Sequence, residues 1–110
     1  MDTRTKIIPL AEAAIRLEQE DLLAVHFDCD PLLASHATAL LKLGRPLLAL
    51  ITEKENSYLP LRARAELAAS LAIIRYVTTG GLKGALDLRT QEAAWRLELE
   101  NLVLAKSEAK

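Results

Sequence analysis

The sequence predicts a Rossmann-like α/β fold of three layers, with helices on both faces of a short parallel sheet of three or four strands. Three short runs, at 22–27, 46–52 and 73–79, are almost wholly apolar, as are strands that are buried on both faces. Segments with helical spacing of apolar residues lie between these runs. Alternation of strand and helix is typical of right-handed βαβ units on a parallel sheet.

Apolar periodicity and the positions of Gly and Pro predict where the helices lie. We expect helices over 9–20, from 31 or 35 to 43, over 61–72 and over 91–106, and a fourth short strand at 86–88. Gly44 is placed to end the second helix, and Thr90 is placed to cap the last one. Asp30 and Pro31 form a good helix start, with the aspartate as N-cap and the proline in the first helical position.

Length and composition predict one domain over residues 1–110 with a modest core. The net charge is −1, and acidic and basic residues alternate, which disfavours nucleic acid or an anionic membrane as partner. The single cysteine, Cys29, excludes an internal disulfide and a zinc site made only of cysteines. No secretory leader and no run of about 20 apolar residues is present, so we expect a cytoplasmic protein.

Ligands of open parallel sheets bind beyond the carboxyl ends of the strands. In this chain those ends are predicted at 27–30, 52–53 and 78–80. The segment from Phe27 to His36 reads FDCDPLLASH and runs from the first strand into the next helix. This segment is where we expect any functional chemistry.

Residues 27–36 resemble the signature of the HxGH, or cytidylyltransferase-like, nucleotidyltransferases, which reads roughly G-[CTV]-F-D-x-x-H-x-G-H. The resemblance is strongest to the heptose-phosphate adenylyltransferase and glycerol-phosphate cytidylyltransferase group. Residues 6–14 look like the lead-in helix of that group, and 60–71 with 76–77 look like its later helix and third strand.

In that family, two histidines contact the phosphates of a nucleoside triphosphate, glycines let the backbone approach the nucleotide, and Mg²⁺ usually assists. The resemblance therefore implies His36 as the catalytic residue, in the place of the second histidine, and Asp30 in the place of the aspartate. The nucleotide-binding residues that we expect are Phe27, Asp28, Cys29, Asp30, Ser35, His36, Thr52 and Arg64.

The signature is degenerate in this chain. Leu33 stands in the place of the first histidine and cannot donate a hydrogen bond to phosphate. Phe27 and Ser35 replace two glycines, and the loop at 53–57 is short. The changes at Leu33 and Phe27 would each cost several kcal/mol of transition-state stabilisation, by analogy with about 3 kcal/mol for one oxyanion donor.

The sequence thus predicts a non-catalytic descendant that serves as a nucleotide-binding, regulatory or assembly module. The alternative is an active enzyme that transfers a nucleotidyl group from ATP or CTP to a small phosphorylated substrate and releases pyrophosphate. Only this alternative requires Mg²⁺ as cofactor, and we expect no other metal site.

Each candidate residue also has a purely structural interpretation. His36 would be a polar residue in the first turn of a helix, and Cys29 a small buried residue. The cations Lys54, Arg62 and Arg64 would form a solvated face instead of meeting an anionic ligand.

Trp95 would be a packing anchor of the last helix, on an apolar side that also holds Leu99, Leu102 and Val103. The first strand is predicted to lie near an exposed edge of the sheet, covered by the last helix or by a second subunit. We therefore expect a homo-oligomer, such as a dimer, or a complex with a protein partner.

Overall fold

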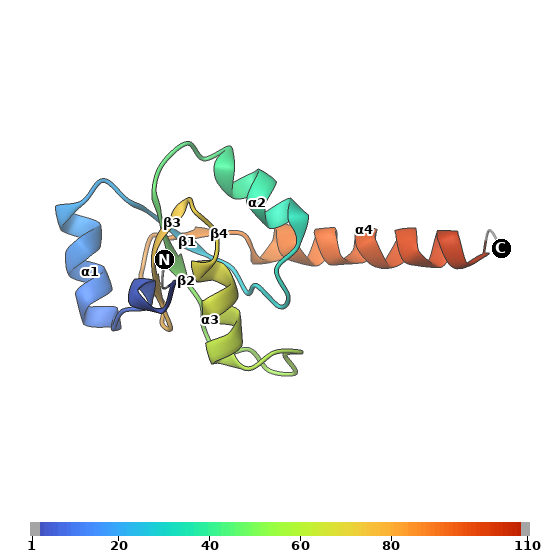
Figure 1. Cartoon of the computed structure of the whole chain (residues 1–110), viewed down its shortest axis with the longest axis horizontal. Coiled ribbons are helices and arrows are strands. Elements are labelled where there is room, and N and C mark those ends of the chain that lie inside the picture. The colour runs from blue at the N-terminus through green and yellow to red at the C-terminus, as the bar shows by residue number, and fades with distance from the viewer. Residues whose placement is uncertain (1–2, 109–110) are drawn as a thin grey trace.

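The fold is that of a computed structural model, which describes residues 3–108 (Figure 1). It confirms the predicted α/β class, with four parallel strands and helices on both faces. In chain order the elements are η1 (Thr3–Lys6), α1 (Leu10–Gln19), β1 (Leu23–His26), α2 (Ala34–Leu41), β2 (Leu47–Leu50), α3 (Leu61–Ala69), β3 (Ile74–Thr78), β4 (Leu86–Asp87) and α4 (Arg89–Glu108).

The strand order in the sheet is β3-β2-β1-β4. Leu23 to His26 of β1 pair with Leu47 to Leu50 of β2, and Val25 pairs with Leu86 of β4 on the other side. β1 thus lies near an edge of the sheet, as predicted, but its outer neighbour is the short strand β4. The chain crosses back after β3, and β4, in place of the predicted α4, pairs with Val25 and His26 of β1.

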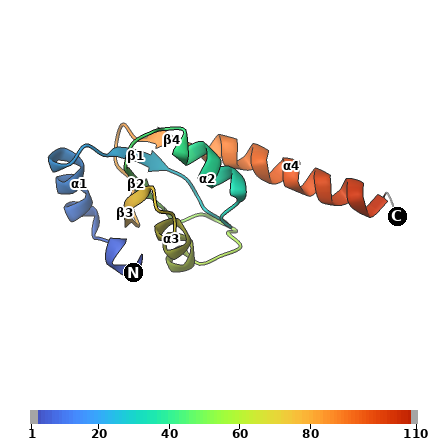
Figure 2. The ribbon, with the colours of Figure 1, turned by 45° about the horizontal axis from the view of Figure 1, so that its top comes forward.

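The central strand β2 is apolar and buried throughout because both faces of the sheet are covered there. Leu47 and Ala49 of β2 belong to the core on one face, where α2 and α3 pack. Leu48 and Leu50 belong to a smaller core on the other face, which α1 covers with Ala13. Figure 2 shows α1 apart from α2 and α3 across the sheet.

Two predicted helix caps are wrong, although the helices begin within one or two residues of the starts predicted at 35 and 91. The helix after β1 begins at Ala34 with Leu33 in the N-cap position, so Asp30 and Pro31 precede it instead of starting it. The last helix begins at Arg89, which places Thr90 inside its first turn. α2 ends at Leu41, two residues before the predicted 43, and Gly44 follows it with a φ of 68°.

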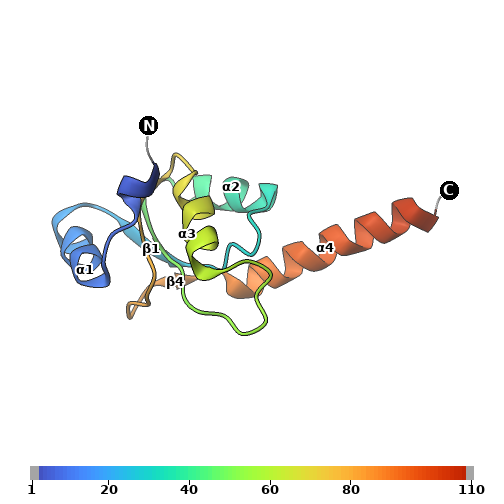
Figure 3. The same ribbon diagram turned by 60° about the horizontal axis from the view of Figure 1, so that its bottom comes forward.

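Helix α4 extends well beyond the rest of the molecule (Figures 1 and 3). Its predicted apolar side is consequently not buried beyond Trp95. Leu99, Leu102 and Val103 are 46%, 54% and 59% exposed. Among the described residues, no helix is long and apolar enough to cross a membrane.

Candidate functional site

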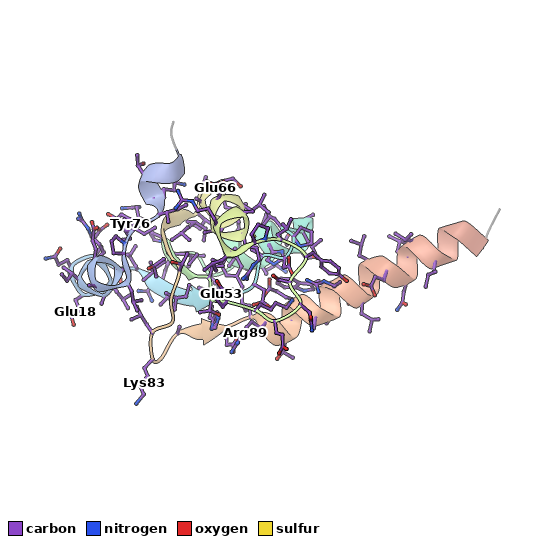
Figure 4. The ribbon with its side chains drawn as sticks, turned by 90° about the horizontal axis from the view of Figure 1, so that it is seen from below. Glu18, Glu53, Glu66, Tyr76, Lys83 and Arg89 are labelled. Atoms are coloured by element: carbon purple, nitrogen blue, oxygen red, sulfur yellow. The ribbon has the colours of Figure 1, made fainter. Side chains whose placement is uncertain are left out.

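The carboxyl ends of the four parallel strands meet at one edge of the sheet, where ligands bind in folds of this class. Phe27 to Asp30 follow β1, Thr52 follows β2, and β4 leads directly into α4. Figure 4 labels two residues that border this edge, Glu53 after β2 and Arg89 at the start of α4.

The centre of this site is the carboxylate of Glu92, from the first turn of α4. Its Oε1 accepts a hydrogen bond from the backbone N–H of Asp28 at 2.6 Å, and its Oε2 accepts one from the N–H of Cys29 at 2.9 Å. The Nε2 atom of His36 lies 2.6 Å from the same Oε2. Two backbone amides and one imidazole therefore converge on one carboxylate.

The hydrogen bonds of His36 also fix its tautomer. Its Nδ1 accepts the backbone N–H of Leu33 at 2.9 Å, so the proton of a neutral ring is on Nε2 and is donated to Glu92. The bond to Leu33 is that of a residue in the third helical position reaching back to its N-cap. His36 does lie in the first turn of α2, as predicted, but it is buried.

Both partners of this pair are shielded from water. Glu92 is 7% exposed and His36 is 1% exposed. The ring of His36 lies 5.0 Å from that of Trp95, edge to face, and 5.7 Å from that of Phe27. Burial alone would raise the pKa of Glu92, but the hydrogen bonds from His36 and from the two amides outweigh it and hold the pKa below its usual range.

Asp30 is buried next to this centre and anchors a loop. Its two carboxylate oxygens accept the backbone N–H groups of Tyr58 and Leu59 at 2.9 and 2.8 Å. Lys54 lies with its Nζ 3.6 Å from the Oδ2 atoms of both Asp28 and Asp30. Burial acts to raise the pKa of Asp30, yet the two amides, with Lys54 and Arg64, lower it overall.

Arg64 contradicts the expectation of a solvated cationic face. Its side chain is fully buried, and it donates to the backbone oxygens of Asp28 at 3.1 Å and Thr52 at 2.8 Å. It thereby ties the ends of β1 and β2 together from α3. Arg62, two residues earlier on the helix, is exposed as expected, and Lys54 is partly exposed.

The remaining predicted site residues do not line one pocket. Phe27 is fully buried in the core. The hydroxyl oxygen of Thr52 lies 2.9 Å from Nε2 of His26. Ser35 lines a groove between α2 and α4. Cys29 is buried, as its structural interpretation predicted. Burial and the charge of Glu92 raise the pKa of the Cys29 thiol to about 12, so it is no nucleophile.

Sequence reasoning missed Glu92 altogether. The only local signal was an acidic residue in the first turn of a helix that follows a short strand. Among the described residues, no group of three His, Cys, Asp or Glu side chains is arranged to hold a metal ion. Comparison of the chain with protein-family models, with curated proteins and with solved structures found no match.

Proposed function

We propose that this domain is a degenerate, non-catalytic relative of the HxGH nucleotidyltransferases that serves as a regulatory or assembly module. One observation carries the proposal. The amides of Asp28 and Cys29 and the Nε2 of His36 all bind the carboxylate of Glu92. These donors stand where the resemblance implies a phosphate of the nucleotide, so the chain supplies its own anion there.

An incoming phosphate would have to displace Glu92. The displaced carboxylate of Glu92 would lose three hydrogen bonds. A free phosphate also loses translational and rotational freedom on binding, which the carboxylate, as part of the chain, does not. A tethered carboxylate is therefore an effective competitor of a free phosphate.

The side chains at this edge also do not fit a magnesium-bound triphosphate. Mg²⁺ is usually held by one or two carboxylates together with the substrate phosphates. Here Asp28 and Asp30 lie against Lys54, and Glu92 already accepts three hydrogen bonds. An active enzyme would need at least one of these carboxylates released from its present partners and another donor in the place of Leu33.

Isothermal calorimetry of the whole chain against ATP and CTP with Mg²⁺ tests the proposal. We expect no saturable heat with either nucleotide. Saturable binding that His36→Ala weakens would overturn the proposal and favour the active enzyme.

The variant Glu92→Ala tests the role assigned to the carboxylate, with Glu100→Ala, an exposed change on the same helix, as the matched control. We expect pyrophosphate to bind the Glu92→Ala protein and not the wild type or the control. If no protein binds pyrophosphate although circular dichroism shows them all folded, Glu92 is not what closes the site.

A further inference from the structure

Helix α4 has two parts with different surroundings. Its first two turns are held by the body, where Glu92 binds His36, Trp95 packs on the same ring, and Arg96 donates to the backbone oxygen of Asp30. A helix of 20 residues is about 30 Å long, so roughly three turns remain beyond these contacts. Figures 1 and 2 show this distal part projecting away from the sheet.

The distal part continues the body-facing side of the helix. Residues spaced by three and four share one face, and Trp95, Leu99, Leu102 and Val103 have this spacing. Trp95 is partly buried, whereas the other three are about half exposed. An apolar stripe that runs past the edge of a domain in this way is typical of a protein–protein contact.

A groove beside the first turns of α4 could accept an apolar helix such as the distal part of α4. It lies between α2 and α4 and has a volume of about 590 Å³. Its lining includes small side chains of α2 and larger ones of α4, namely Ala34, Ser35, Thr38, Ala39, Trp95 and Glu98. The small side chains on α2 leave room for the backbone of another helix to approach.

We propose that the distal part of α4 from a second copy of this chain occupies this groove, in a reciprocal two-fold dimer. The two α4 helices run antiparallel, so that each distal part lies against the first turns of the partner's α4 and against the partner's α2. In this proposal the partner in the assembly role is a second copy of the chain, and the proposal rests on that proposed function. A two-fold contact of this kind is the commonest form of homo-oligomer.

The surface area that would be buried favours two helices in two grooves over a contact between the two distal parts alone. Three helical turns are about 18 Å long and 11 Å wide, and half of such a cylinder presents about 300 Å². Two distal parts that touched only one another would bury about 600 Å², which is typical of an incidental contact. Two helices in two grooves bury about 1,200 Å², which reaches the range of specific interfaces.

Charge is balanced in this arrangement. Glu98 lies in the groove near the middle of α4, so the two copies bring two glutamates close to the two-fold axis. Lys42 of α2 lines the same groove, so each groove also carries a positive charge. The net charge of −1 adds little repulsion between copies.

Light scattering coupled to size-exclusion chromatography of the whole chain tests the dimer. We expect a mass that rises with concentration to twice the 12.1 kDa of one chain. Leu102→Asp places a charge in the groove and should leave a folded monomer. Leu104→Asp is the matched control, because Leu104 is similarly exposed, at 59%, and two residues further on it points to the opposite side of the helix.

Oxidative cross-linking tests the antiparallel register. Helices packed 8–10 Å apart place facing Cα atoms about 5 Å apart near a two-fold axis, which a disulfide can span. We expect Glu98→Cys to form a covalent dimer and Glu100→Cys, on the far side of the helix, to remain monomeric in a denaturing gel. Cys29 is buried and does not interfere.

A monomeric mass at every concentration, or equal behaviour of the two aspartate variants or of the two cysteine variants, would overturn the dimer. The calorimetry above separates the two proposals. A monomer that binds no nucleotide overturns only the dimer, and a dimer that binds nucleotide overturns only the closed site.

Discussion

The Nε2 atom of His36 lies 2.6 Å from the carboxylate of Glu92, although 56 residues separate them in the chain. The pair joins the first turn of α2 to the first turn of α4, and the same carboxylate also binds the backbone that follows β1. The side chain of Glu92 thus holds together three segments that are distant in sequence.

Replacing Glu92 with alanine should therefore cost stability. The change leaves the amides of Asp28 and Cys29 and the ring of His36 without their acceptor, which we expect to lower the free energy of unfolding by about 3 kcal/mol. Urea denaturation at a fixed protein concentration measures this. Glu100→Ala, on the exposed side of α4, should change it by less than about 0.5 kcal/mol. Equal effects of the two changes would contradict the central role of Glu92.

Acid should destabilise the fold. The pKa of Glu92 and the pKa of Asp30 are both lower in the folded chain than their ordinary values of 4.5 and 3.8. The unfolded chain therefore binds more protons at low pH, and the stability contributed by the two carboxylates is complete above about pH 5 and lost as the pH falls through the folded values. Thermal unfolding between pH 7 and pH 3 follows this loss.

The matched variant for the acid experiment is Asp30→Asn. It removes one of the two titrating groups, so its stability should fall less steeply with acidity than that of the wild type. The pKa of Asp87 is also lowered, by its bonds to Arg89, but this exposed pair is unchanged in both proteins. A stability that rises between pH 5 and pH 3 would contradict the ionised state of Glu92 and Asp30.

The thiol of Cys29 should be inert in the native protein. It is fully buried, and its pKa is raised to about 12, so neither the reagent nor the thiolate is available. Labelling with a chromogenic disulfide at pH 8 should be negligible in buffer and complete in denaturing urea. Fast labelling of the native chain would show that the segment after β1 opens readily.

Arg64 should tolerate no other cation. Its guanidinium donates to two backbone oxygens, and the single ammonium of lysine cannot reproduce that fork. We expect Arg64→Lys to lower the free energy of unfolding by about 2 kcal/mol, measured in urea. The exposed Arg62 offers the control, since Arg62→Lys should be nearly neutral. Similar results for both would mean that the buried hydrogen bonds of Arg64 contribute little.

The order of helices and strands could be predicted from local patterns. Segments that are apolar throughout, such as 46–52, become strands covered on both faces, and periodic segments such as 61–72 become helices. Local patterns also predicted that Cys29 is buried and that His36 lies in the first turn of a helix. Each of these features depends on neighbours within a few residues, and such neighbours are visible in a sequence.

The pairing of β4 with β1, the burial of Arg64 and the acceptor for His36 could not be predicted in this way. These features join residues that are far apart in the chain, namely 26 and 87, 28 and 64, and 36 and 92. Such residues become neighbours only when the strands align and α3 and α4 pack against the sheet. An arginine among helical residues and a glutamate in a first turn look like solvated side chains. Their burial results from where the packed elements put unpaired backbone groups, and no local pattern encodes that position.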